Sequence, residues 1–192
     1  MAVTSKKAIK VADKGKLKVL ESERRARKKI FIFISFFALY MIVFYFIWLS
    51  EFFNNKVNPR IDSAYAIIGS LILNIFGQGT SQFGASVSSP FFAIVINRGC
   101  DAVEATALFV SALLAFPGKW KKKIIGLMKG VAILFILNII RIVSLFLIGR
   151  YYPGYFDYFH VEVWQVIFVI IAFGLFVSWV KSQTLETVEI EK

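Results

Sequence analysis

The sequence predicts an all-α integral membrane protein with four transmembrane helices and one interfacial or half-inserted helix. Of its 192 residues, 58% are hydrophobic, and the mean hydropathy is +0.69. The apolar residues fall in runs of roughly 20, the length that crosses about 30 Å of hydrocarbon. Basic clusters flank these runs: 11 of the 23 Lys and Arg residues lie in 1–29, and four lie in 119–123. Lys and Arg beside membrane spans stay on the cytoplasmic side, so both termini are expected in the cytoplasm.

The predicted organisation has three parts: a basic cytoplasmic arm over 1–29, a membrane domain over 30–181 and a cytoplasmic tail over 182–192. The four spans are expected at about 30–49, 101–116, 124–148 and 161–180. The first apolar run is too long for the core of a typical signal peptide, and no small-x-small cleavage site follows it. We therefore interpret this run as a retained span.

The segment 61–76 has a helical period but only about 16 residues, and serine and asparagine residues interrupt it. It therefore falls short of a full crossing. The turn-rich segment 77–90 cannot lie bare in lipid, because its backbone groups would lack hydrogen-bond partners. The short run 91–96 is β-prone.

Crossing parity favours one place for 61–76, and the six-span alternative would need 61–76 and 86–97 both to cross. Because the arm 1–29 and the loop 119–123 are both expected inside, residues 50–100 must contain an even number of crossings. Sixteen residues cannot supply two crossings. We therefore expect 61–76 to be the interfacial or half-inserted helix on the outer face, and Cys100 to lie outside.

Cys100 is the single cysteine, and it stands where a polar segment turns into an apolar helix. One cysteine excludes an internal disulfide, and one histidine excludes a His-rich metal site. No metal is expected, and no cofactor is expected either. Asp101 and Glu104 are expected to form the N-cap and N3 capping pair of the helix. Both anions would raise the pKa of the thiol unless Arg141 or Arg98 offsets them. Taken alone, Cys100 fits a small apolar residue packed at a helix start.

Arg141 lies within the predicted span 124–148, roughly 10 Å below the outer surface. A charged side chain there is costly unless it meets a partner or a watery cavity, so Arg141 is a candidate functional residue. Asn138 lies three residues earlier on the same helix face. A structural ion pair between Arg141 and Glu104 or Asp101 is the alternative, and it is compatible with a catalytic role.

His160 follows an aromatic external loop, 149–159, and opens the last predicted span. An isolated histidine at an interface is often incidental, but Cys100, Arg141 and His160 all map to the outer face. A histidine within hydrogen-bond reach can take the proton of a thiol and return it to a leaving amine. An arginine can hold the thiolate or a developing oxyanion. Together the three residues predict a cysteine nucleophile at the outer face.

This pattern resembles the exosortase/archaeosortase family. Cys100 opens one span, the next contains Leu-Asn-Ile-Ile-Arg-Ile-Val at 137–143, and an aromatic loop ends in His160. The similarity covers about residues 60–181, and the short chain is similar to the abbreviated XrtF-type exosortases. Two features depart from the family pattern. The family cysteine is usually followed by a small polar residue and Gly, here replaced by an Asp and an Ala, and the additional N-terminal spans of longer members are missing.

The resemblance implies a membrane-embedded cysteine protease or transpeptidase of the cytoplasmic (inner) membrane, with its active site facing the periplasm or exterior. Its substrates would be exported proteins that end in a short recognition motif, a membrane helix and a basic tail. The family roles imply Cys100 as the nucleophile, Arg141 as the stabiliser and His160 as the proton carrier. Asn138, Glu104, Asp101 and Arg98 are supporting candidates.

Other functional classes fit the sequence less well. Nucleic-acid binding is disfavoured because the basic residues flank apolar spans, where they also contact membrane lipid. A rhomboid-type serine protease lacks its nucleophile motif, and a transporter would need paired discontinuous spans. The main alternative is a non-catalytic membrane scaffold or accessory protein in envelope or exopolysaccharide assembly.

Overall fold

The computed structural model describes the backbone of residues 2–190 and the side chains of residues 20–183. The five α-helices are α1 (Ala2–Trp48), α2 (Asn58–Ile75), α3 (Val103–Ala115), α4 (Trp120–Tyr151) and α5 (Trp164–Ile190). Short π-helices or 3-10 helices cover Phe53–Val57 (η1), Pro153–Tyr155 (η2) and Tyr158–Val163 (η3). The three strands are β1 (Ser81–Phe83), β2 (Ser86–Ser88) and β3 (Ala93–Val95). For the predicted arm and tail, the side chains before residue 20 and beyond residue 183 lie outside the described residues.

Among residues 20–183, three helical stretches are long and apolar enough to cross a membrane: Leu20–Trp48, Trp120–Tyr151 and Pro153–Gln183. Each overlaps one of the predicted spans, and the chain is a mainly helical membrane protein. The remaining predicted span, 101–116, corresponds to α3. This helix has 13 residues, which at 1.5 Å per residue is about 20 Å, less than a full crossing.

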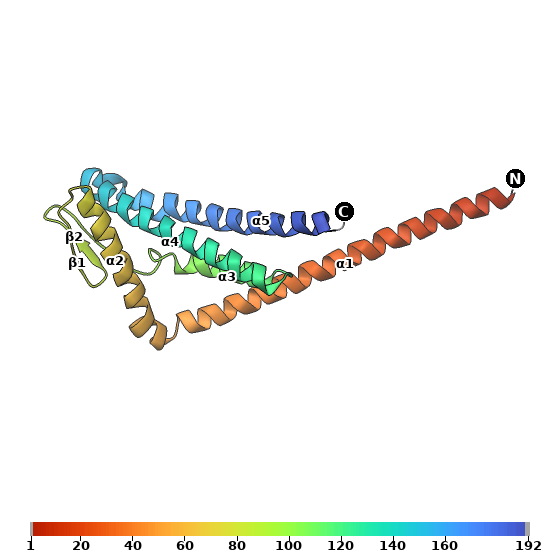
Figure 1. The fold of residues 1–192 in the computed structure, drawn as a ribbon, viewed down its shortest axis with the longest axis horizontal. Helices are drawn as coiled ribbons and strands as arrows, with labels where there is room; N and C mark the ends of the chain where they lie inside the picture. Colours follow the sequence, from red (N-terminus) through yellow and green to blue (C-terminus); the bar gives the residue numbers. More distant parts are fainter. Residues whose placement is uncertain (1, 191–192) are drawn as a thin grey trace.

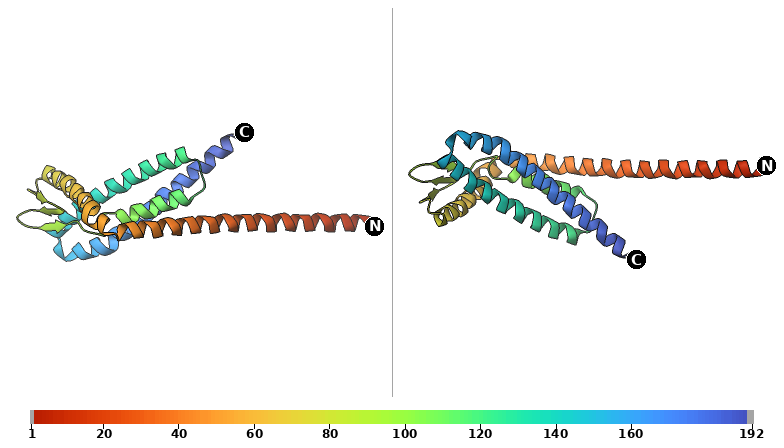
Figure 2. Two further views of the ribbon diagram at one scale, coloured as in Figure 1. Left: turned by 90° about the horizontal axis from the view of Figure 1, so that it is seen from below. Right: turned by 90° about the horizontal axis from the view of Figure 1, so that it is seen from above.

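The long helices run side by side (Figure 1). α4 and α5 are antiparallel, and α3 packs against both. The C-terminal part of α1 packs along α3, and its N-terminal part extends away from the bundle. α2 and the sheet lie at the end of the bundle opposite the two termini, and α2 runs at a steep angle to α4 and α5 (Figures 1 and 2). The loop between α3 and α4, which leads into the basic run 119–123, lies toward the same end as the termini.

Close packing fixes α3 against α4. A Cβ atom added at Gly130 would collide with the ring of Phe109, so glycine is required for this approach. Near the C-terminal end of α3, the Nζ atom of Lys123 in α4 donates to the carbonyl of Leu114 at 2.7 Å. A lysine at a helix C-terminus satisfies a carbonyl that has no partner within the helix. These contacts set the depth of α3 in the bundle.

Two hydrophobic clusters meet at the residue predicted to be the nucleophile. One joins α3, α4 and α5, and the other joins α2, the sheet and α4. The first includes Phe109, Leu113, Leu134, Leu145, Trp164 and Phe168; the second includes Tyr65, Leu73, Val87, Ile96, Ile142 and Phe146. Cys100 packs against both clusters. Its position is therefore determined by the whole bundle rather than by one helix.

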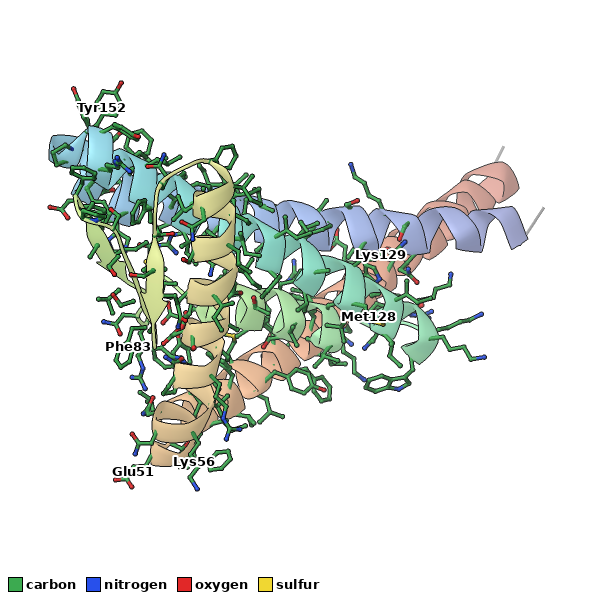
Figure 3. All side chains as sticks on the ribbon, turned by 60° about the vertical axis from the view of Figure 1, so that its left-hand side comes forward. Glu51, Lys56, Phe83, Met128, Lys129 and Tyr152 are labelled. Atoms are coloured by element: carbon green, nitrogen blue, oxygen red, sulfur yellow. The ribbon has the colours of Figure 1, made fainter. Side chains whose placement is uncertain are left out.

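The expectation of an all-α fold is wrong for the turn-rich segment after α2. The three strands form an antiparallel sheet in the order β1-β2-β3. Asn74 of α2 anchors its start, because Asn74 Oδ1 accepts the Thr80 N–H at 2.6 Å and Asn74 Nδ2 donates to the Thr80 carbonyl at 2.8 Å. Figure 3 shows the sheet beside α2, with Phe83 at its outer rim. Pairing in hairpins satisfies backbone groups that a polar loop would leave without partners.

Candidate active site

A tight turn presents Cys100 to the bundle. The N–H of Cys100 donates to the carbonyl of Asn97 at 2.8 Å, and Gly99 at the third position of this turn has φ +86°. A turn with positive φ at its third residue favours glycine, which has no Cβ to clash. Ala102 then takes the left-handed conformation at φ 55° before α3 begins. A non-glycine residue pays about 1–2 kcal/mol there, so the chain around Cys100 is strained.

The predicted capping pair of Asp101 and Glu104 is wrong. The N-cap of α3 is Ala102, which provides no side-chain hydrogen bond, and Glu104 is exposed in the first turn. The buried Asp101 accepts the N–H of Val103 at 3.1 Å through Oδ1. Because the chain makes a left-handed turn at Ala102, the helix begins one residue later than the capping pattern required.

The side chains of Cys100 and His160 are in direct contact. The Sγ atom of Cys100 lies 2.8 Å from Nε2 of His160. His160 belongs to the π-helix η3, an irregularity that is frequent at functional sites. Its ring stacks on Phe156 at a centroid distance of 5.5 Å. Two residues separated by 60 positions in the chain therefore form a thiol–imidazole pair.

An aromatic series supports the imidazole. Phe156, the neighbour of His160, packs edge-on against Phe92 with centroids 5.7 Å apart. Phe92 in turn fits against α4 at Gly149, where an added Cβ would collide with its ring. The position of the His160 ring thus depends on a glycine of α4 through two phenyl rings.

Arg141 links the two halves of this pair. Its Nη1 donates to the carbonyl of Gly99 at 2.7 Å, and its Nη2 donates to the carbonyl of His160 at 3.3 Å. Among the described side chains, neither Asp101 nor Glu104 forms an ion pair with Arg141. The guanidinium is buried among protein groups instead. One residue of α4 therefore holds both the loop of the thiol and the helix of the imidazole.

Burial raises the pKa of the Cys100 thiol above its ordinary value. The positive charge of Arg141 acts against this rise, whereas the carboxylates of Asp101 and Asp62 add to it. Burial, with a contribution from Asp101, also raises the pKa of Asp62 to about 6. This rise favours the neutral thiol, so a reaction at sulfur would first require the loss of its proton.

Two of the supporting candidates lie away from the thiol–imidazole pair. Arg98 donates from Nη2 to the carbonyl of Trp48 at 3.4 Å, and its guanidinium stacks over the Trp48 ring at 4.6 Å. It therefore attaches the end of α1 to the Cys100 loop. Asn138 is completely buried one turn before Arg141. Within the described side chains, neither Arg98 nor Asn138 hydrogen-bonds to Cys100 or His160.

A pocket of about 370 Å³ opens beside the pair. Cys100 and His160 lie on its wall, together with Phe92–Ile96 along the sheet and Asp157. Among residues 20–183, no three His, Cys, Asp or Glu side chains gather closely enough to hold a metal ion. The pocket therefore offers a thiol, an imidazole and a strand edge to a ligand.

A family model described as transmembrane exosortase matches residues 29–177. The chain belongs to the transmembrane exosortase family. The predicted resemblance is thus confirmed, and the matched range contains Cys100, Arg141 and His160. No curated protein and no solved structure matches the chain. Membership of this family points to a transpeptidase-like role in the membrane.

Two acidic residues, one on the pocket wall and one whose charge acts on Cys100, were not identified from the sequence. Asp157 lies on the pocket wall, and Asp62 of α2 is buried and accepts a hydrogen bond from Asn58 at 2.7 Å. The sequence contains a feature that could have identified each of them. Asp157 precedes His160 by three residues, which places both on one helix face, and Asp62 is an acid within a mainly apolar helix.

Proposed function

We propose that this exosortase cleaves the C-terminal sorting signals of exported proteins at the outer face of the cytoplasmic membrane. Cys100 acts as the nucleophile and His160 as the proton carrier. The 2.8 Å contact between Sγ and Nε2, at the wall of a pocket, is the observation that supports this function most strongly. A neutral thiol beside an imidazole needs only a bound carbonyl to begin acyl transfer.

The proposed reaction has two halves. Nε2 of His160 takes the Sγ proton of Cys100 while sulfur bonds to the scissile carbonyl carbon, forming a tetrahedral intermediate. The carbon–nitrogen bond then breaks, and the imidazolium gives its proton to the leaving amine. The product is a thioester on Cys100. Water or an acceptor amine, deprotonated by His160, attacks this thioester and regenerates the thiol.

Arg141 acts in this scheme as a positioning residue. Its two hydrogen bonds go to the carbonyls of Gly99 and His160, so it fixes the sulfur against the imidazole. Its charge also favours the thiolate electrostatically. This role differs from direct stabilisation of the oxyanion, which would require donors free to reach the substrate.

Four crossings with both termini in the cytoplasm fit this arrangement. Arg141 precedes Tyr151, the last residue of α4, by ten residues, or about 15 Å. Because Arg141 bonds to Gly99, the loop 96–101 that carries Cys100 enters the bundle to that depth. From there α3 needs only 13 residues to reach the opposite end. At both ends of this loop the chain is buried, at Ile96 and Asp101, whereas Asn97, Arg98 and Gly99 between them are exposed.

The depth of the pocket also indicates the form of the substrate. An exported protein with its own membrane helix would present the adjacent peptide at the level of Cys100. A basic tail would remain with the Lys-rich side of the membrane by the same rule that orients this chain. We therefore propose a tail-anchored exported protein as the partner.

The first test uses the single cysteine. In intact spheroplasts, a membrane-impermeant maleimide should label Cys100, and Cys100→Ser should abolish the signal. In parallel, processing of a co-expressed exported protein with a C-terminal membrane helix and basic tail should stop in Cys100→Ser and fall strongly in Arg141→Ala. Undiminished processing in both variants would favour the non-catalytic scaffold and contradict the enzyme.

A further inference from the structure

The strand β3 is an edge of the sheet. It pairs with β2 through Val87↔Ile94. Beyond this pair on one side, the N–H of Ser89 donates to the carbonyl of Phe92 at 2.8 Å. On the other side, the N–H of Ile96 donates to the carbonyl of Ala85 at 2.9 Å. In an antiparallel ladder, hydrogen-bonded pairs alternate with non-bonded pairs. The residues between the bonded positions, Ala93 and Val95, therefore point their N–H and C=O groups away from β2.

This free edge borders the candidate active site. The pocket that contains Cys100 and His160 is lined by five consecutive residues, Phe92–Ile96. Successive side chains of a strand point to opposite faces, so five consecutive residues meet one pocket only along the backbone edge. Within the described part of the chain, no other backbone or side-chain group hydrogen-bonds to the main chain of Ala93 or Val95.

The edge lacks the features that usually prevent a strand from pairing further. Natural edges are protected by lysine, proline, bulges or a covering segment. β3 consists of Ala93, Ile94 and Val95, and the Val95 side chain is 59% exposed. A row of unpaired N–H and C=O groups on an apolar edge is a template for a further strand, so this edge is best satisfied by a strand that arrives from outside.

We infer that the open edge of β3 binds the acyl-donor segment of the substrate as an added β-strand. The N–H and C=O groups of Ala93 and Val95 pair with the extended peptide on the acyl side of the scissile bond, as in other recognition by strand addition. This pairing keeps the acyl segment bound while the amine leaves. The inference rests on the proposed function and assigns the substrate a conformation: extended, and held through its main chain.

The test uses acetyl-Ala-Ala-Ala-chloromethyl ketone and the full chain in nanodiscs. The Cys100 thiolate displaces chloride and forms a thioether, which mass spectrometry quantifies at the single cysteine. Three further probes each carry one N-methyl group, on the first, second or third amide from the ketone. A strand-paired peptide uses alternate amides, so methylation at one parity should slow alkylation about tenfold, as for one main-chain hydrogen bond, and methylation at the other parity should not.

Matched variants test the same edge from the protein side. Val95→Pro removes an N–H that points into the pocket without removing a bond to β2, and it should slow the peptide reagent about tenfold. Gln82→Pro is the control, because Gln82 pairs with Val87 at the opposite edge of the sheet. The alternation places its N–H on the outside. This variant should react at the rate of the unmodified protein.

Iodoacetamide, which needs no strand pairing, separates the inference from the proposed function. Equal slowing by all three N-methyl probes, or slowing by none, would overturn strand addition. If iodoacetamide still alkylates Cys100 in a His160-dependent way, the proposed function remains supported. If Cys100 reacts with neither iodoacetamide nor the peptide ketone, both the proposed function and the inference are overturned.

Discussion

Arg141 of α4 donates a hydrogen bond from Nη1 to the carbonyl of Gly99 at 2.7 Å, and so holds the residue directly before Cys100. The same guanidinium reaches the carbonyl of His160, on the other side of the site. A charged residue inside a membrane bundle normally finds a carboxylate or a watery cavity. Here two main-chain carbonyls take that place, and the distance between thiol and imidazole depends on them.

Replacing Arg141 with Lys should therefore impair catalysis although the positive charge remains. A lysine ammonium cannot reproduce the planar fork that reaches both carbonyls. We expect processing to slow by about 10- to 100-fold, since each hydrogen bond from a charged group contributes about 1.5–3 kcal/mol. Arg150→Lys is the matched control, because Arg150 bonds to Gln78 outside the site. Equal rates for the two variants would show that only the charge of Arg141 matters.

Replacing Asp101 with Asn should make the thiol more reactive at neutral pH. The Asp101 carboxylate raises the pKa of Cys100, so loss of its charge lowers that pKa and increases the thiolate fraction. Iodoacetamide alkylation at pH 7 should become several-fold faster, and its pH profile should shift to lower pH. Arg141→Met should shift the profile in the opposite direction. The exposed Glu104→Gln is the control and should leave it unchanged; no shift in Asp101→Asn would refute this electrostatic account.

The left-handed backbone at Ala102 gives a stability prediction. Ala102→Gly relieves a conformational cost of about 1–2 kcal/mol but loses a buried methyl group of about 0.8 kcal/mol. Ala105→Gly, within α3, has no strain to relieve and should lose about 1 kcal/mol. Thermal unfolding in detergent should rank Ala102→Gly above Ala105→Gly by about 1–2 kcal/mol. Equal losses would indicate that φ 55° at Ala102 is not a strained conformation.

Gly149 tests the aromatic support of the imidazole. In Gly149→Ala the new methyl group would displace the Phe92 ring, which packs on Phe156 and through it on His160. We expect a loss of about 1–3 kcal/mol in stability from overpacking, and slower processing at a temperature where the variant is folded. Gly174→Ala is the control: no atom lies within 4 Å of its Cβ position, and alanine favours the helix. A fully active, folded Gly149→Ala would refute the role of this series.

The long helices were predictable, because mean hydropathy and the basic clusters beside the spans are averaged over many residues. A single unusual residue therefore does not change the prediction. The sheet was not, since three-residue strands rich in serine carry little periodic signal, and only the β-prone run 91–96 indicated it. The start of α3 was misplaced for a similar reason. A capping pattern at Asp101 and Glu104 does not reveal that Ala102 adopts a left-handed conformation.

For the candidate site, Cys100, Arg141 and His160 stood out because each is rare for its surroundings: a single thiol, a charge within a span and a single imidazole. Their partners could not be deduced in the same way. Any main-chain carbonyl can accept from Arg141, and no residue type marks Gly99 or His160 as the acceptor. The edge of β3 likewise has no sequence signature, because it acts through its backbone.

The rate at which iodoacetamide alkylates Cys100 at pH 7, in the unmodified protein and in His160→Gln, tests the central claim most directly. Both proteins are compared in nanodiscs after their unfolding temperatures are shown to agree. If Nε2 of His160 accepts the thiol proton across the 2.8 Å contact, the substitution should slow alkylation by about tenfold or more, because it removes the neighbouring base. The same rate in both proteins would mean that the imidazole does not activate the sulfur, and would contradict the proposed site.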